Sequence, residues 1–86
     1  MNIRPSIETL FAESLREAEA AVPVAFDDDL VLLESGLDSL GFAVLVTRLE
    51  LALGYDPFSL MDEPFYPQTF GEFVGIYDQF KEHANS

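Results

Sequence analysis

The stretch Glu34-Ser-Gly-Leu-Asp-Ser-Leu-Gly-Phe42 leads into the most apolar segment of this 86-residue chain. Beyond it, apolar residues recur at steps of three and four, which is the spacing of one face of a helix. These residues are Phe42, Leu45, Leu49, Ala52 and Leu53. Gly54 is a common C-terminal signal, so the pattern predicts a helix over residues 39–53. Ser39 would begin this helix, directly after Asp38. Either residue is a common helix cap, and the serine is alternatively a reactive centre.

Three further segments predict helices. Pro5 opens an apolar stripe that predicts a helix over residues 5–20, which Pro23 prevents from continuing. Ser59 is the predicted cap of a short helix over residues 59–63. Thr69 and Glu72 have the spacing of a capping box, and the apolar stripe after them predicts a last helix over residues 69–82. The stripes comprise Ile7, Leu10, Phe11, Leu15 and Ala18 in the first helix and Phe70, Phe73, Val74, Tyr77 and Phe80 in the last.

A long connection, residues 21–36, joins the first two long helices. Its apolar residues predict that it lies across the core, with a short helical turn within residues 29–34. Asp27, Asp28 and Asp29 suggest calcium, but the segment lacks the glycine and glutamate of an EF-hand loop, so a solvated acidic turn is predicted. No strand pattern of useful length occurs. The sequence therefore predicts one all-α domain over residues 1–86, a small four-helix bundle with three long helices and one short.

The charge balance limits the classes of partner. Sixteen acidic side chains face four basic ones, which gives a formal net charge of −12. Nucleic acids and anionic lipid surfaces would repel such a chain, whereas proteins with basic patches would attract it. The acidity alternatively serves only to keep the protein soluble. The absence of cysteine fits a reducing compartment, and neither a signal peptide nor a membrane-spanning run is evident. We expect a cytoplasmic protein that does not insert into membranes.

Self-contained catalysis is not predicted for Ser39. A nucleophile elbow has glycine two residues on either side of the serine; Gly41 fits this pattern, but Leu37 does not. The single histidine, His83, lies near the C-terminus, and with no cysteine we expect no metal site. A helix N-terminus instead favours an attached anion, by about 0.3–1 kcal/mol.

The motif Gly36-Leu-Asp-Ser-Leu40, before an amphipathic helix in an acidic four-helix chain, resembles the attachment motif of acyl carrier proteins and peptidyl carrier proteins. The resemblance implies that Ser39 bears 4′-phosphopantetheine, which a phosphopantetheinyl transferase transfers from coenzyme A. It also implies that Asp38 helps this magnesium-using transferase to engage the site. The terminal thiol of the arm would hold an acyl or aminoacyl group as a thioester. The chain itself would be a non-catalytic carrier and not an enzyme.

The same resemblance implies a partner-docking surface on the helix behind the serine. It comprises Leu40, Gly41, Ala43, Val44 and Thr47. Glu50 is the only acidic residue between residues 40 and 53, so we expect recognition to be more apolar than salt-bridged. Val44 and Leu51 are alternatively buried beneath the long connection.

The segment Thr47-Arg-Leu49 resembles peptidyl carriers more than fatty-acid carriers. This favours a monomeric, free-standing carrier of a specialised biosynthetic pathway, with a short acid or an amino acid as cargo. Its partners would be an acyl- or aminoacyl-loading ligase and downstream acyl-processing enzymes. The alternative is an acidic helical protein-interaction module without a prosthetic group.

Overall fold

The computed structural model describes residues 3–63 and 66–83, and this part of the chain folds into four α-helices and two 3-10 turns. The elements in chain order are α1 (Arg4–Glu17), η1 (Leu32–Glu34), α2 (Ser39–Leu53), α3 (Pro57–Leu60), α4 (Phe70–Gln79) and η2 (Lys81–His83). The described residues include no β-strand, only an isolated bridge between Val31 and Thr69. None of these helices is long and apolar enough to span a membrane. The fold is a small all-α bundle, as the sequence predicts.

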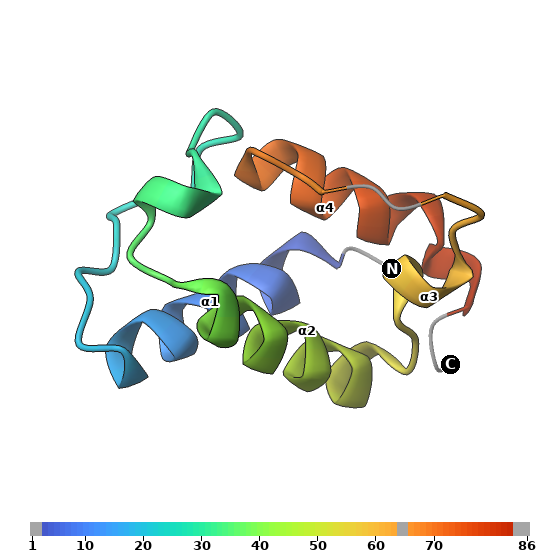
Figure 1. The fold of residues 1–86 in the computed structure, drawn as a ribbon, viewed down its shortest axis with the longest axis horizontal. Coiled ribbons are helices and arrows are strands. Elements are labelled where there is room, and N and C mark those ends of the chain that lie inside the picture. The colour runs from blue at the N-terminus through green and yellow to red at the C-terminus, as the bar shows by residue number, and fades with distance from the viewer. Residues whose placement is uncertain (1–2, 64–65, 84–86) are drawn as a thin grey trace.

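Figure 1 shows how the helices are arranged. The first two helices, α1 and α2, lie side by side, and α4 lies across the top of the view above both. The short α3 closes one end of the bundle, and the connection between α1 and α2 closes the other end. The N-terminus of α2 therefore lies toward the end of the bundle formed by the long connection.

Aromatic side chains from three helices and the connection meet at Phe11 of α1. Its ring makes edge-to-face contacts with Phe26, Phe42 and Phe70 at centroid distances of 5.4, 5.8 and 5.7 Å. A further edge-to-face contact joins it to Phe73 at 6.5 Å. Each such pair stabilises the fold by about 0.5–1.5 kcal/mol beyond the burial of its area.

The predicted apolar stripes supply most of the core. Ile7, Phe11, Leu15, Leu45, Leu49, Leu53, Phe70, Phe73 and Tyr77 are all buried. Ala18 and Ala52, at the edges of two predicted stripes, are exposed instead. Ile76 is buried although it lies outside the predicted stripe of the last helix.

The predicted bounds of the first helix, 5–20, are wrong at the C-terminal end, because α1 ends at Glu17. Glu19 adopts a left-handed conformation with φ of 58°. The Ala20 N–H then donates to the Leu15 carbonyl at 2.8 Å, and the Glu19 N–H donates to the Arg16 carbonyl at 3.1 Å. This pair of hydrogen bonds is a Schellman motif, which satisfies the last carbonyls of the helix and turns the chain away.

The predicted third helix, 59–63, is also wrong, because α3 begins two residues earlier, at Pro57. The cap is Asp56, whose carboxylate accepts a hydrogen bond from the Phe58 N–H at 2.9 Å. Pro57 occupies the first helical position, where the missing N–H is not needed. The Ser59 hydroxyl does not cap the helix; it donates to the Asp56 carbonyl at 2.9 Å.

The last helix, predicted over 69–82, is shorter and covers Phe70–Gln79. The predicted capping box is confirmed: the Glu72 N–H donates to the Thr69 hydroxyl and the Thr69 N–H donates to the Glu72 carboxylate, both at 3.2 Å. Phe80 leaves the helical conformation, with φ of −109° and ψ of 17°. The chain then tightens into the 3-10 turn η2, as helix ends commonly do.

The connection between α1 and α2 is bound to the start of α4 by backbone hydrogen bonds. The Leu32 N–H donates to the Gln68 carbonyl at 2.9 Å, and the Phe70 and Gly71 N–H groups donate to the Leu30 and Asp28 carbonyls at 2.8 and 3.0 Å. We call these three bonds the backbone clasp. A Cβ atom on Gly71 would lie 2.8 Å from that of Asp28, so the close approach requires glycine. The connection lies across the core, as predicted, and its own residue Leu32 is buried there.

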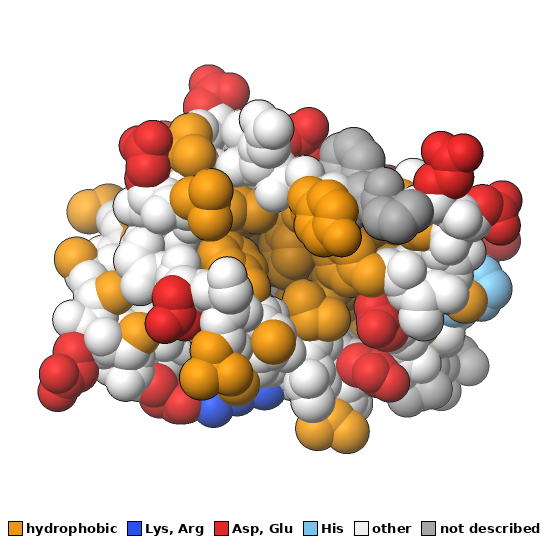
Figure 2. All heavy atoms as spheres, viewed as in Figure 1, with side chains coloured by type: hydrophobic (Ala, Val, Ile, Leu, Met, Phe, Trp, Pro, Cys, Tyr) orange, Lys and Arg blue, Asp and Glu red, His pale blue; other side chains and the backbone are white. Residues whose placement is uncertain are grey.

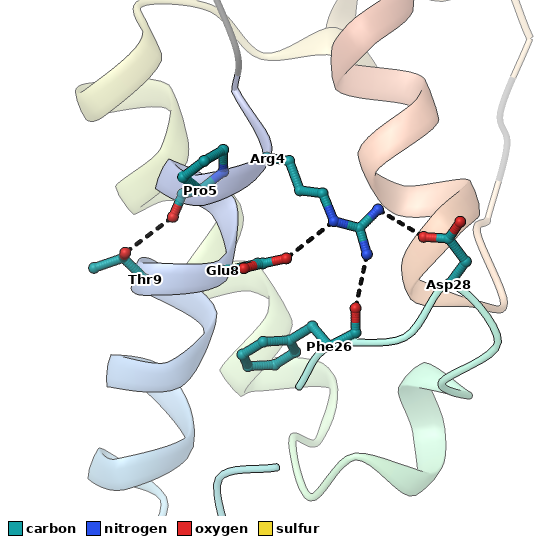
Figure 3. Close-up of polar contacts among 6 residues, drawn as sticks. All are labelled: Arg4, Pro5, Glu8, Thr9, Phe26 and Asp28. Carbon is teal, nitrogen blue, oxygen red and sulfur yellow. Dashed lines mark hydrogen bonds and ion pairs between the residues drawn. The ribbon is translucent and has the colours of Figure 1, made fainter. Parts of the chain in front are cut away.

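Arg4 reinforces the same junction, as Figure 3 shows. Its guanidinium donates to Glu8 at 2.9 Å, to Asp28 at 2.6 Å and to the Phe26 carbonyl at 2.7 Å. The group also lies over the Phe70 ring, 5.1 Å from its centroid. We call this cluster the Arg4 latch. It joins α1, the connection and α4 through one side chain.

Candidate functional site at the N-terminus of the second helix

Ser39 is the first residue of α2, and the preceding residue supplies the cap. The Asp38 carboxylate accepts a hydrogen bond from the Gly41 N–H at 2.7 Å, and its carbonyl accepts one from the Phe42 N–H at 3.0 Å. Ser39 is exposed, and its hydroxyl makes no hydrogen bond to any described residue. The sequence allowed either Asp38 or Ser39 as the helix cap, and the structure shows that Asp38 is the cap. The serine hydroxyl is therefore not occupied in capping the helix.

Gly36 positions this serine by allowing the chain to turn tightly against the end of α1. Its φ of 112° is strained for other residues, and a Cβ atom there would lie 2.7 Å from the Cβ of Ala20. The preceding turn is held by the Ser35 hydroxyl, which donates to the Leu32 carbonyl at 2.6 Å. Leu37 is buried, 4% exposed. The backbone is therefore anchored on the side of Ser39 that precedes the helix.

The predicted docking residues lie together along the start of α2. Leu40 is 73% exposed and Val44 is 40% exposed. Ala43 and Thr47 are exposed as well, whereas Gly41 is half-buried. A Cβ atom on Gly41 would lie 3.3 Å from the capping oxygen of Asp38, so the glycine leaves room for the cap.

An exposed stripe extends this surface to the end of the helix. Leu40, Val44, Thr47 and Leu51 follow one another at steps of four, three and four, which places them on one helical face. Leu51 is 81% exposed. The long connection therefore does not bury Val44 or Leu51, which answers the alternative raised by the sequence. We call these four residues the outer stripe.

A shallow groove, which the sequence did not predict, lies between the end of α1 and the start of α2. Its volume is about 220 Å³. One wall comes from Ser14 and Glu17 of α1 and the helix cap Ala18, and the other includes Leu40, Val44 and Arg48 of α2. We call it the α1–α2 groove. Three of the predicted docking residues, Leu40, Gly41 and Val44, line it. No sequence signal identifies the α1 wall, because it depends on which helix faces pack together.

Polar groups in this groove satisfy one another. Arg48 donates to the Glu17 carboxylate at 2.6 Å and is within 3.5 Å of the buried Ser14 hydroxyl. The hydrogen bond from Arg48 holds the pKa of Glu17 below its usual value. The positive charge of Arg48 is therefore already neutralised by a neighbour in the fold.

A second hydrophobic feature lies on the opposite edge of α2. Figure 2 shows hydrophobic side chains in a hollow between α2 and α4, with acidic side chains around it. Phe42 of α2 and Phe58 of α3 are half-buried, and each ring lies 6.3 Å from that of Phe73. Side chains of two helices thus flank the buried Phe73 ring.

The described residues offer no arrangement for metal binding, since no group of three or more His, Asp or Glu side chains among them is placed to hold an ion. His83 lies in η2, where its ring is 6.2 Å from Phe80. Figure 1 shows this turn, drawn in red, at the opposite end of the bundle from the start of α2. What this site offers chemically is the unbonded hydroxyl of Ser39 at a helix N-terminus, an environment that stabilises an attached anion.

No family model, no curated protein and no solved structure matches this chain.

Proposed function

We propose that this chain is a non-catalytic carrier protein of the acyl and peptidyl carrier type, with an acyl-carrier-like fold and 4′-phosphopantetheine attached to Ser39. The observation that carries the proposal is the exposed Ser39 hydroxyl, which is free of hydrogen bonds to the described residues because Asp38 supplies the helix cap. The motif Gly36-Leu-Asp-Ser-Leu40, which resembles the attachment motif of these carriers, supplies that serine within a small helical bundle.

The residues around Ser39 fit a phosphodiester at this position. The hydroxyl is exposed, so a transferase can reach it, and Gly41 adds no bulk within the first turn of the helix. The positive end of the α2 dipole lies beside the serine and favours the phosphate charge. When bound, the arm supplies a thiol that holds an acyl or aminoacyl group as a thioester.

The partners under this proposal are a phosphopantetheinyl transferase, a ligase that loads an acyl or aminoacyl group, and downstream acyl-processing enzymes in the cytoplasm. Leu40 and Val44 are accessible next to the serine, which supports apolar recognition of these enzymes. The net charge of −12 supports basic partner surfaces and argues against nucleic acid. Such a surface suits a carrier of a specialised pathway.

A second candidate function is an acidic protein-interaction module without a prosthetic group. The outer stripe favours it, because exposed Leu40 and Leu51 could contact a partner helix without any modification of Ser39. The two functions differ in one chemical property, which is whether the serine is modified.

Intact mass spectrometry separates them. We expect the protein, incubated with coenzyme A, magnesium and a promiscuous phosphopantetheinyl transferase, to gain the mass of one phosphopantetheine. Ser39→Ala should gain none. Ser6→Ala is the matched control, since Ser6 is also exposed in the first turn of a helix, and it should be modified like the wild type. An unmodified wild-type protein with a helical circular dichroism spectrum, or an adduct on Ser39→Ala, would exclude the carrier function at this serine.

A further inference from the structure

The α1–α2 groove lies directly beside Ser39. Asp38 and Leu40, the two chain neighbours of the serine, both line it. The opposite wall comes from the last turn of α1 and its cap, through Glu17 and Ala18. An enzyme that reaches the Ser39 hydroxyl from this side therefore passes over the groove.

The size of the groove suits one side chain and is small for a drug-sized ligand. Its volume of about 220 Å³ is below the range of roughly 300–1,000 Å³ that is typical of ligand pockets. An apolar cavity of about 150 Å³ is enough to hold a benzene molecule. One large aliphatic or aromatic side chain would fill the α1–α2 groove.

The chemistry of the walls selects an apolar group. Leu40, Val44 and Ala18 offer carbon surface, and Leu40 and Val44 are left exposed by the fold. The single cation, Arg48, is held by Glu17, so the groove provides no uncompensated positive charge for an anion. Filling it with an apolar side chain would remove hydrophobic surface from water.

Two carboxylates line this apolar groove. Glu17 keeps 62% of its side chain exposed despite its ion pair, and Asp38, which also lines the groove, is exposed as well. They belong to a molecule with a net charge of −12. A complementary partner surface therefore carries Lys or Arg around its apolar side chain, and a second copy of this chain would be repelled.

We propose that the α1–α2 groove is the receptor for one large apolar side chain, flanked by basic residues, on the enzymes that act on Ser39. The inference rests on the proposed carrier function and extends it, because it adds the end of α1 to the docking surface. The docking surface then has two walls, and α2 supplies only one of them.

Filling the groove tests the proposal, with the promiscuous phosphopantetheinyl transferase and coenzyme A as the probe. Ala18→Leu places a larger side chain in the groove at an exposed position. We expect kcat/KM for modification to fall roughly tenfold, as when a central interface contact is lost. Ala52→Leu is the matched control, since Ala52 is exposed beside a different depression between the same helices. It should be modified at the wild-type rate.

A second variant separates apolar docking from simple charge attraction. Val44→Glu makes the surface more acidic while removing an apolar wall of the groove. We expect slower modification, whereas a surface that works by charge alone would give faster modification. Circular dichroism and thermal melting verify that each variant is folded.

The outcomes are distinguishable. Equal modification rates for Ala18→Leu and Ala52→Leu, or faster modification of Val44→Glu, would overturn the proposed role of the groove. An adduct on the wild type would still support the carrier function. A concentration-dependent dimer that Ala18→Leu abolishes in sedimentation would assign the groove to self-association instead and would also overturn the proposal. Absence of any adduct on the folded wild type would remove both proposals together.

Discussion

Tyr77 has a buried side chain whose hydroxyl finds no hydrogen-bond partner among the described residues. Its ring is well packed, at 5.2 Å from Phe73 and 6.0 Å from Phe58. The neighbouring Tyr55 differs, because its hydroxyl donates to the Tyr77 carbonyl at 2.5 Å. A buried polar group without a partner costs about 1–3 kcal/mol, so these two tyrosines have opposite effects on stability.

We expect Tyr77→Phe to raise the free energy of unfolding by about 1 kcal/mol at neutral pH, because it keeps the ring and removes the unpartnered hydroxyl. Tyr55→Phe is the control and should lower it by about the same amount, because it removes a hydrogen bond. Urea denaturation measures both. A destabilised Tyr77→Phe would mean that the hydroxyl has a partner, such as a buried water, and would contradict the expectation.

The same two tyrosines should make the free energy of unfolding depend on pH at alkaline pH. Burial raises the pKa of Tyr77 and of Tyr55 above the ordinary value of 10.0. The folded state then holds these protons more tightly than the unfolded state does. The two protonated hydroxyls therefore contribute fully to the free energy of unfolding below pH 10, and this contribution is lost as the pH rises through the pKa values of the folded state. We expect the free energy of unfolding of the wild type to decline above pH 10, and that of Tyr77→Phe to decline less steeply. Parallel declines in urea titrations would contradict this.

At the scale of the helices, the strength of local end signals decides how well the sequence predicts each element. The bounds of α2 are predicted correctly, because Asp38 caps one end and Gly54, with φ of 89°, ends the other. The end of α1 could not be predicted, because its left-handed residue is Glu19 rather than a glycine. The start of α3 was misplaced because Asp56-Pro57 suits a turn as well as a cap with a first helical residue.

Features of the site that depend on tertiary packing are harder to predict from the sequence. The exposure of Ser39 and Leu40 follows from their positions at a helix start outside the apolar stripe. The α1–α2 groove could not be predicted, because Ala18 looks like an edge residue of the first stripe until the packing of the two helices is known. The backbone clasp could not be predicted either, since hydrogen bonds between main-chain groups place no demand on most side chains.

The Arg4 latch joins three elements, and its loss should therefore reach beyond α1. We expect Arg4→Met, which retains an unbranched stem, to lower the free energy of unfolding by about 1 kcal/mol. This is less than the roughly 1.5–3 kcal/mol typical of hydrogen bonds to charged groups, because the site is partly exposed. Arg16→Met is the control: Arg16 is exposed, makes no ion pair with the described residues, and should change stability by less than about 0.5 kcal/mol. Equal effects of the two substitutions in urea denaturation would show that the latch contributes nothing.

For the whole molecule, the dominant electrostatic effect is self-repulsion. Arg4, Arg48 and Lys81 already form ion pairs with Glu8, Asp28, Glu17 and Asp78, and the net charge remains −12. The molecule measures 32 × 26 × 22 Å. The Debye length is about 30 Å at 0.01 M ionic strength, so at low salt every carboxylate acts on every other.

We expect NaCl to stabilise the fold and to slow its modification. Between about 0.01 M and about 1 M salt the Debye length falls to about 3 Å, which screens repulsion within the protein and attraction to a basic partner alike. The melting temperature should rise while kcat/KM for the transferase falls. KCl at the same ionic strength is the control and should act equally. A melting temperature that falls with NaCl would mean that ion pairs, and not self-repulsion, dominate the balance.

The backbone clasp also has a consequence for the order of folding. An isolated helix as short as α4, with 10 residues, is only marginally stable in water. Two N–H groups of its first turn, those of Phe70 and Gly71, bond to carbonyls of residues 30 and 28. These two bonds form only when the connection far upstream has its native shape, so the N-terminal end of α4 is complete only then. Residues 31–69, including α2, lie within the chain loop that the two bonds close.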